Sequence, residues 1–478
     1  MINKKTAIYI TGILFLLLQV ISTGNLYASG NSQQQSPKKL FQAGAATTNT
    51  SPSMDIEMRS SPAIVNIHDE LHARCLVLDD GEKRLAFVVV DIIGLNRDLI
   101  DEAKRIIYEE NDLSPENVMV SSTHTHSMAR ATGPPPYDEY QKFIIRRIAD
   151  AVKKAIFNLE PARIGWGAGD VPEHVFVRRW FMKPGSPVPN PYGGEDKVMM
   201  NPGRLNPNIV EPAGKPDPEV SVISVQSLEG RPIALFANYS LHYVGGVPRG
   251  HISADYFAVF ADRMKELLGA DRQDPPFVGI MSNGTSGDVN NINYAVPGQN
   301  YPPYARMKVV ANDVAKEVMR VYENIEHHDW AGLQSAQQEL TLKVRKPDSK
   351  MIAHAKEVLA GTDQRVGPHG SSKHYNEGLL NRLDMPDNVD ILLQSFRIGD
   401  LAIATIPFET FAEIGLEIKE KMKSRPAFTI ELANGSYGYL PTPRQHEWGG
   451  YESWTNKFEY DASVKIVDSL MKMFETFE

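Results

Sequence analysis

The chain has 478 residues, of which 42% are hydrophobic and 23% are charged, and this ordinary composition argues against disorder over most of its length. The formal net charge of −9 argues against a nucleic-acid binder that relies on a basic surface. A single cysteine, Cys75, excludes an intramolecular disulfide framework, a multi-cysteine zinc site and a CxxC redox motif, so any metal site must use His, Asp, Glu or Tyr side chains.

Residues 1–28 have the pattern of a secretory signal peptide. Two lysines precede an apolar run from Ala7 to Ile21, and small residues follow it. The run is short for a membrane-spanning helix, which needs about 20 apolar residues, and an uncleaved anchor is the alternative. The polar residues 29–39 predict a disordered linker. We therefore predict an exported protein, periplasmic or secreted, with no membrane-spanning segment beyond the signal.

The remainder, residues 40–478, alternates short β-branched runs with helical patterns. A strand at 84–93, a helix at 99–109 and a strand at 117–122 form a unit whose strands should pair in parallel. Further strands are predicted at 162–167, 220–226, 232–240, 277–282, 337–344, 389–398, 401–407 and 427–432, and further helices at 140–159, 256–268, 304–324, 410–424 and 460–478.

Two segments give no clear periodic element. Residues 181–218 are crowded with Pro, Gly and Asn, which predicts a long loop or flap. Residues 347–387 are polar and less regular. Further on, Gly399-Asp400 predicts the turn of a hairpin between the strands at 389–398 and 401–407. The mixture predicts an α/β fold with mixed β-sheets flanked by helices, in a single large catalytic domain.

Two histidines follow directly after the predicted strand at 117–122, in the sequence Thr-His-Thr-His-Ser. In an extended segment, positions i and i+2 point to the same side, so His124 and His126 should face one site. Strand ends in α/β folds open onto the ligand crevice. One imidazole could bind a metal while the other donates a hydrogen bond, the alternative being an ordinary surface or core pair.

Three other segments place polar side chains at the ends of predicted strands. His242 lies just after the strand that contains Phe236. The alternative to a ligand role is a structural histidine whose hydrogen bonds are satisfied within the fold. Glu409 follows an apolar strand at a helix start, where a carboxylate also complements the helix dipole. The loop 434–442 is rich in glycine and presents Tyr437 and Tyr439.

Taken together, these segments resemble the catalytic domain of neutral ceramidases. The ordered set is the THTHS motif, the strand-end FAxxxxH, the IPxE before a helix and the late NxxxxY loop. The segment 43–52, with AGAA followed by Ser-Pro, is similar to that family's opening, and LHARCLVLDDG at 71–81 is similar to its next strand and turn. The resemblance runs from about residue 43 to the C-terminus.

The resemblance implies a zinc ion held by His124, His242, Glu409 and Tyr439, which are suitable zinc ligands. It further implies that a metal-bound hydroxide attacks an N-acyl linkage of a lipid-like or small substrate.

Three other side chains are implied to act on the substrate. His126 and Tyr451, which lies twelve residues after Tyr439, would stabilise the oxyanion or protonate the leaving amine. Arg178 or Arg179 would contact a polar or anionic substrate group, with a surface ion pair as the alternative.

The sequence departs from the family in three places. Asn290 stands where the family has its serine, and it could donate a hydrogen bond to an oxyanion but not act as the nucleophile. Met128-Ala129-Arg130 replaces small residues after the histidine motif, so the substrate mouth should differ. The family's C-terminal sandwich domain is not expected.

Asp91 or Asp255 could orient the ligating histidines. Two alternatives to hydrolysis of an N-acyl linkage stay open. The protein could be a metallohydrolase that cleaves another bond, such as an ester, or a non-catalytic binding protein stabilised by a metal.

Overall fold

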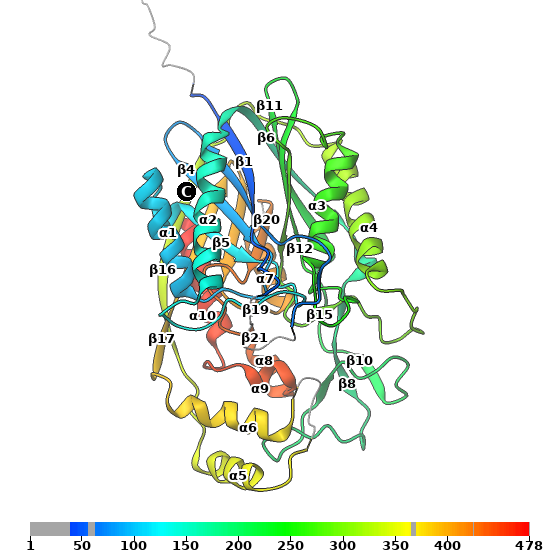
Figure 1. Cartoon of the computed structure of the whole chain (residues 1–478). Helices are drawn as coiled ribbons and strands as arrows, with labels where there is room; N and C mark the ends of the chain where they lie inside the picture. Colours follow the sequence, from blue (N-terminus) through cyan, green and yellow to red (C-terminus); the bar gives the residue numbers. More distant parts are fainter. Residues whose placement is uncertain (1–38, 56–62, 365–369, 424, 478) are drawn as a thin grey trace, which may run out of the picture. The chain divides into compact units, whose positions relative to one another are not determined.

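The computed structural model describes residues 39–55, 63–364, 370–423 and 425–477 (Figure 1). The predicted signal peptide and all but the last residue of the predicted linker lie outside the described residues, so export stays a prediction. Among the residues that are described, no helix has both the length and the apolar character needed to cross a bilayer.

The larger sheet has eight strands, in which two pairs are parallel. Strand β4 pairs in parallel with β5, and β12 pairs in parallel with β14, whereas the other neighbours are antiparallel. The helices α1 (Arg97–Asn111) and α3 (Asp255–Leu267) make the two crossovers, which confirms the predicted strand–helix–strand unit. In spatial order the strands are β14 (Val278–Asn283), β12 (Pro232–Tyr239), β11 (Glu219–Ser227), β6 (Glu160–Asp170), β1 (Gln42–Asn49), β3 (His72–Asp79), β4 (Arg84–Val90) and β5 (Val118–Ser122).

The second sheet has four strands and also contains a parallel pair joined by a helix. Its order is β16 (Leu333–Lys343), β17 (Asn388–Ile398), β18 (Leu401–Ile406) and β20 (Ala427–Glu431). The antiparallel β17–β18 hairpin turns at Gly399, as predicted; its φ is +60°, and a Cβ there would lie 2.5 Å from the Trp166 ring. Strands β18 and β20 are parallel and are joined by α7 (Ala412–Met422).

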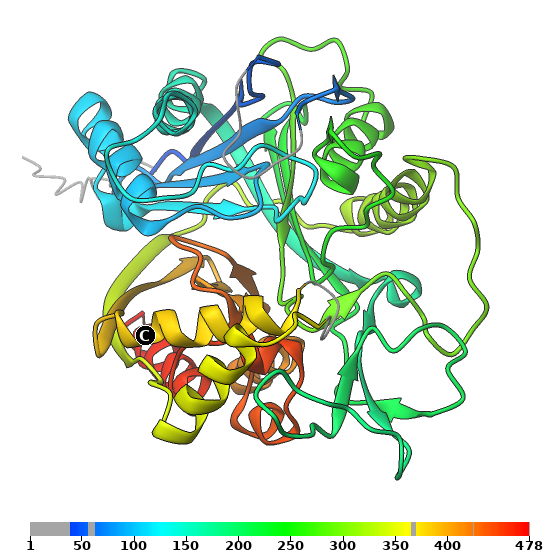
Figure 2. The same ribbon diagram turned by 60° about the horizontal axis from the view of Figure 1, so that its bottom comes forward.

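The two sheets pack face to face, with helices on both outer sides (Figure 2). Phe87 of the large sheet contacts Phe396 of the small one, their ring centroids 5.0 Å apart. Helices α1 and α2 (Glu139–Phe157) cover one half of the large sheet, and α3 and α4 (Ala305–Tyr322) cover the other. Helices α7 and α10 (Ala462–Glu475) cover the small sheet. This α/β architecture confirms the predicted fold class.

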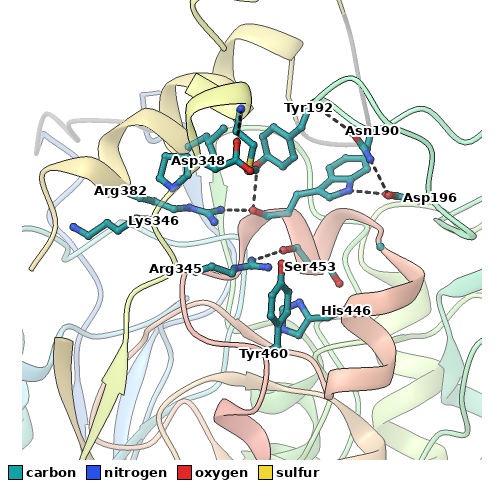
Figure 3. Close-up of a pocket in the computed structure, with 15 residues that line it drawn as sticks. Asn190, Tyr192, Asp196, Arg345, Lys346, Asp348, Arg382, His446, Ser453 and Tyr460 are labelled. Carbon is teal, nitrogen blue, oxygen red and sulfur yellow. Dashed lines mark hydrogen bonds between the residues drawn. The ribbon is translucent and has the colours of Figure 1, made fainter. Parts of the chain in front are cut away.

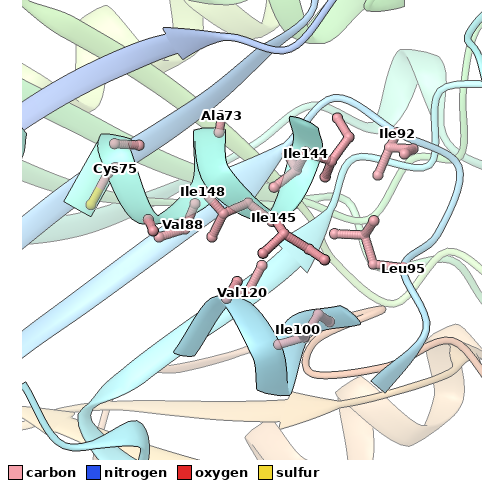
Figure 4. Close-up of a cluster of buried hydrophobic side chains, with 14 of the residues drawn as sticks. Ala73, Cys75, Val88, Ile92, Leu95, Ile100, Val120, Ile144, Ile145 and Ile148 are labelled. Carbon is pink, nitrogen blue, oxygen red and sulfur yellow. The ribbon is translucent and has the colours of Figure 1, made fainter. Parts of the chain in front are cut away.

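The packing under α2 explains why that helix could be predicted from its sequence. Ile144, Ile148 and Val152 recur every fourth residue and are all buried. Figure 4 shows the isoleucines against Val88 and Val120 of the sheet. Burial of one such side chain contributes about 1.5–3 kcal/mol to folding.

The segment predicted as a long loop contains a small sheet, so that prediction is wrong. It includes the second half of β8 (Arg179–Met182), together with β9 (Val198–Met200) and β10 (Ile209–Pro212). Strands of three or four residues are too short to show an alternating pattern among so many turn residues. The unclear segment 347–387 holds α5 (Ser349–Ala360) and α6 (Ser372–Leu380), and in α5 Ala355 alone is buried, so no apolar stripe marks it.

The other short elements form loops and edges around these layers. They are β2 (Asn66–Ile67), β7 (Phe176–Val177), β13 (His251–Ile252), β15 (Val289–Asn290), β19 (Glu409–Thr410), β21 (Tyr439–Leu440), α8 (Pro443–Trp448), α9 (Tyr451–Thr455) and the 3-10 turns Pro115–Asn117, Pro172–His174 and Asn381–Leu383.

Lys104 of α1 should make the stability of the protein depend on pH. Its side chain is buried, Nζ has no hydrogen-bond partner among the described residues, and burial lowers the pKa to about 7. An unfolded lysine has a pKa of about 10.4, so between these values the unfolded chain holds a proton that the folded chain releases. The free energy of unfolding should therefore rise with pH from about 7 to about 10.

The Lys104→Met variant should remove this dependence and be more stable at pH 7, by on the order of 2–4 kcal/mol. Urea unfolding across that pH range measures the effect. Lys142→Met, on an exposed lysine of α2, is the matched control and should follow the wild type. An unchanged pH slope in Lys104→Met would contradict the prediction.

Candidate active site

The four predicted ligand residues come after the carboxyl ends of parallel strands in both sheets. His124 follows β5 and His242 follows β12 of the large sheet, whereas Glu409 follows β18 and Tyr439 follows β20 of the small one. The two sheets meet here, because the backbone N–H of Ser122 donates to the carbonyl of Leu432 at 3.2 Å. The crossover topology thus brings the four segments to one place (Figure 1).

The two histidines of the THTHS motif meet, but not for the predicted reason. His124 has a φ of +64°, so the backbone is not extended there and simple alternation does not apply. The backbone N–H of His124 is tied to the carbonyl of Ile92 at 2.9 Å, and the turned ring places its Nε2 3.1 Å from Nε2 of His126. His124 is buried, whereas His126 is exposed and stacks on Tyr243, with ring centroids 3.9 Å apart.

A backbone carbonyl fixes the proton on the His124 ring. Nδ1 donates to the carbonyl oxygen of Ile93 at 2.6 Å, which leaves the Nε2 lone pair directed into the site. Burial alone would lower the pKa of His124, but the adjacent Glu409 carboxylate outweighs burial, and the pKa is raised.

A serine and a second carboxylate hold His242. Its Nδ1 lies 3.3 Å from Oγ of Ser286, whose hydroxyl donates to Oε1 of Glu431 at 2.6 Å. When Ser286 donates to Glu431, its Oγ can accept from Nδ1–H, and Nε2 is the His242 nitrogen that faces Glu409. Burial, with the charges of His124 and Arg178, holds the pKa of His242 well below its usual value. Sequence reasoning missed the role of Glu431. This residue lies near the end of the predicted strand 427–432, much as Glu409 lies just after the predicted strand 401–407.

Glu409 lies between the two ligand histidines. Its Oε2 is 3.2 Å from Nε2 of His124 and 3.9 Å from Nε2 of His242. This buried oxygen accepts no hydrogen bond from the described part of the chain. Burial raises the pKa of the carboxyl, but His124 and a hydrogen bond from Tyr439 outweigh burial and lower it. The carboxylate is therefore ionised and directed at the Nε2 atoms of both imidazoles.

Tyr439 is held beside Glu409 by the pairing of β19 with β21, in which these two residues are direct partners. Burial and the Glu409 charge raise the pKa of the phenol well above its usual value. The Tyr451 ring crosses the Tyr439 ring edge to face, with centroids 5.5 Å apart, and burial also raises the pKa of Tyr451.

The two predicted arginines share one buried carboxylate. Arg178 Nε donates to Oε1 of Glu452 at 2.9 Å, and Arg179 Nη1 donates to Oε2 at 2.5 Å. All three side chains are buried, so the alternative of a surface ion pair is wrong. Arg178 faces the site, because its guanidinium lies 5.3 Å from the centre of the Tyr439 ring, whereas Arg179 turns away to Gln445 and the carbonyl of Gly449.

Comparisons with known proteins support the fold in which this site lies. No protein-family model matches the chain. Neutral ceramidase B of Dictyostelium discoideum is 22% identical over 293 residues, a match that covers 56% of this chain and spans only 37% of that curated relative. The crystal structure of neutral ceramidase from Pseudomonas aeruginosa superposes with a TM-score of 0.67 over 91% of this chain and 74% of that one, at 16% identity. The chain contains a neutral ceramidase-like domain.

A second solved structure, a ceramidase complexed with C2, agrees with this assignment. It gives a TM-score of 0.66 at 14% identity and covers 91% of this chain and 75% of that one. The resemblance predicted from the motifs is thereby confirmed at the level of the fold.

In the ceramidase-like domain, Asn290 lies beside the site in β15, where its Nδ2 donates to Asn201 at 3.0 Å and to Tyr294 at 2.9 Å. Both amide hydrogens are engaged in this arrangement, so a role as an oxyanion donor stays a prediction that requires one of them to be released.

The suggestion that Asp91 or Asp255 orients a ligating histidine is wrong. Asp91 pairs with Arg74, and Asp255 accepts the backbone N–H groups of Val244 and Gly245 in the loop after His242.

The donor set of the ceramidase-like domain fits a cation. The ligand nitrogens of His124, His126 and His242 all lie within 4.8 Å of one another. His124 and His242 direct their Nε2 atoms into the site, because Ile93 and Ser286 engage their Nδ1 atoms, and the buried Glu409 Oε2 beside them has no hydrogen-bond partner within the described structure. A buried acceptor without a partner is unfavourable, and a bound cation would satisfy the Glu409 oxygen together with the two imidazole nitrogens beside it.

Proposed function

We propose that the ceramidase-like domain is a zinc-dependent hydrolase that cleaves the N-acyl (amide) linkage of a lipid-like or small substrate. The observation that carries this proposal is the convergence of three lone pairs, from His124, His242 and Glu409, at the carboxyl ends of parallel strands. The relatives whose fold the domain shares are named as ceramidases, which supports an amide rather than another bond.

In this proposal the cation is held by His124, His242, Glu409 and Tyr439. Neutral imidazoles, a carboxylate and a phenol oxygen form the nitrogen and oxygen set that zinc accepts. Bound there, zinc would supply Lewis-acid chemistry, polarising a carbonyl group and lowering the pKa of a water molecule. The Ile93 carbonyl and the Ser286–Glu431 pair hold the two imidazoles in the tautomer that ligation requires.

The exposed side of the site offers groups for the substrate. His126 is exposed and fixed against Tyr243, so its Nε2 can transfer a proton to the leaving amine. The Tyr451 phenol, whose pKa is raised by burial, stays protonated at neutral pH and can donate to the substrate carbonyl oxygen. The guanidinium of Arg178 lies 5.3 Å from the centre of the Tyr439 ring and can contact a polar substrate group.

Serine chemistry has no part in this proposal. Asn290 replaces the serine of the family, and the nearby Ser286 is buried, with its hydroxyl hydrogen directed to Glu431. Ser286 is a positioning residue for His242 rather than a nucleophile.

Removal of the metal tests the proposed function. Protein treated with a chelator should lose turnover of N-acyl amides, and one equivalent of zinc should restore it. A matched panel of esters with the same acyl chains distinguishes amide hydrolysis from the ester alternative, and substrate binding without turnover would identify a non-catalytic binding protein. Turnover that survives complete removal of the metal would contradict the proposal.

A further inference from the structure

A cavity of about 360 Å³ lies beside α9, the helix that also carries Tyr451 and Glu452 (Figure 3). Its wall includes Arg345, Arg382, His446, Ser453, Trp454 and Tyr460. We call this cavity the arginine pocket. Its volume lies within the range of small-molecule sites, which is about 300–1,000 Å³.

Two arginines of the arginine pocket have incomplete hydrogen bonding. Arg382 is 5% exposed and donates from Nη2 to the carbonyl of Trp454, whereas its Nε is buried and has no partner among the described residues. Arg345 donates from Nη2 to the carbonyls of Ser453 and Asn456, at 3.1 and 2.8 Å, and its buried Nε is equally without a partner in the described chain. Figure 3 shows the guanidinium group of Arg345 directed at Ser453.

The carboxylates that line the arginine pocket are engaged elsewhere. Asp196 accepts the backbone N–H of Gly450 at 2.6 Å and the indole N–H of Trp454 at 2.7 Å. Asp348 caps α5. Within the described ranges, neither Arg345 nor Arg382 forms an ion pair with a carboxylate, in contrast to the buried Arg178 and Arg179, which share Glu452.

The uncompensated positive charge has an electrostatic effect on the groups around it. Burial and the neighbouring Arg345 lower the pKa of Arg382. Burial, together with Arg345, also lowers the pKa of His446 to about 3, so this imidazole is neutral and adds no charge. Its buried Nδ1 has no partner in the described structure. A buried cation without a counter-charge is unfavourable, and an anion between Arg382 and the half-buried Arg345 would remove that cost.

We propose that the arginine pocket binds an oxyanion, a phosphate or sulfate group, held by the guanidinium groups of Arg345 and Arg382. Guanidinium forks match the geometry of such a group and form charge-assisted hydrogen bonds to it. The cavity is larger than a single oxyanion, and the rings of Tyr192, Trp454 and Tyr460 line it, so there is room for a small organic part esterified to the anion.

Calorimetric titration at constant ionic strength tests the proposal, with inorganic phosphate, sulfate and phenyl phosphate as probes and chloride as the blank. We expect saturable binding at one site per chain. The Arg382→Gln and Arg345→Gln variants should each bind at least about tenfold more weakly, because each removes a charge-assisted contact. Arg272→Gln is the matched control, since that side chain is 94% exposed and lies outside the pocket, and it should bind as the wild type does.

Two further titrations locate the bound anion and define its chemistry. Glu409→Gln should still bind phosphate, which separates the arginine pocket from any phosphate bound at the proposed metal site. Tighter binding of phenyl phosphate than of phosphate identifies a phosphate ester as the ligand, and equal binding identifies the free anion. The wild-type titration needs no variant to fold, so absence of saturable binding in it would overturn the proposal. Unchanged affinity in a folded Arg345→Gln/Arg382→Gln double variant would also overturn it.

Discussion

Under the proposed function, the Glu409→Gln variant should bind little zinc, and its turnover of N-acyl amides should fall by on the order of 10³-fold or more. Glutamine keeps the shape of the side chain but replaces an anionic oxygen with a neutral amide. That oxygen is the buried acceptor that lies 3.2 Å from Nε2 of His124 and 3.9 Å from Nε2 of His242. Metal analysis of purified protein, together with initial rates on the N-acyl panel, measures both effects.

Glu413→Gln provides the matched control for this substitution. Glu413 lies four residues further on, in the first turn of α7, and its carboxylate accepts from Thr442 and Arg444 rather than facing the histidines. We expect its zinc content and turnover to stay close to those of the wild type. Equal zinc content and equal rates in Glu409→Gln and Glu413→Gln would exclude Glu409 as a ligand.

Removing the carboxylate of Glu452 should cause a large loss of stability. In the Glu452→Ala variant, Arg178 and Arg179 stay buried without the counter-charge that they share. Breaking a buried ion pair by removal of one partner costs about 3–5 kcal/mol, and here two cations lose their partner together. Denaturant unfolding measures the free energy, and activity should fall as well, because Arg178 packs against the Tyr439 ring.

Glu417→Ala separates this effect from the general loss of a surface charge. Glu417 lies on α7 and pairs with Lys421, and their side chains are 48% and 43% exposed. An exposed pair contributes about 0–1 kcal/mol, so this variant should remain within that range of the wild type. If both variants lost the same stability, the buried cluster would not be the source of the effect.

The layered fold could be predicted because its central strands are buried on both faces. The run Leu85–Val90 is apolar without interruption and bounded by polar residues, which is the pattern of a strand between two layers. Helix α2 carries an apolar stripe for the same reason. By contrast, α5 buries Ala355 and little else, so its sequence contains no comparable signal.

The site was only partly predictable, because its chemistry depends on contacts between distant segments. The order of motifs indicated His124, His242, Glu409 and Tyr439 as partners. The proton on each imidazole, however, is set by the Ile93 carbonyl and by Ser286, and Ser286 is fixed by Glu431, 145 residues away. The left-handed backbone at His124 also differs from the extended one that the motif suggested. Such contacts become visible only once the two sheets are assembled.

The division of the proposed ligands between two sheets has a consequence for how activity can arise. His124 and His242 belong to one layer, and Glu409 and Tyr439 belong to the other, so no contiguous peptide or isolated half of the domain carries a complete set. A chain in which only one of the two sheets has folded would hold two of the four groups in place. Under the proposed function, hydrolysis would therefore report that both halves have docked, and it could serve as a reporter of complete maturation during synthesis.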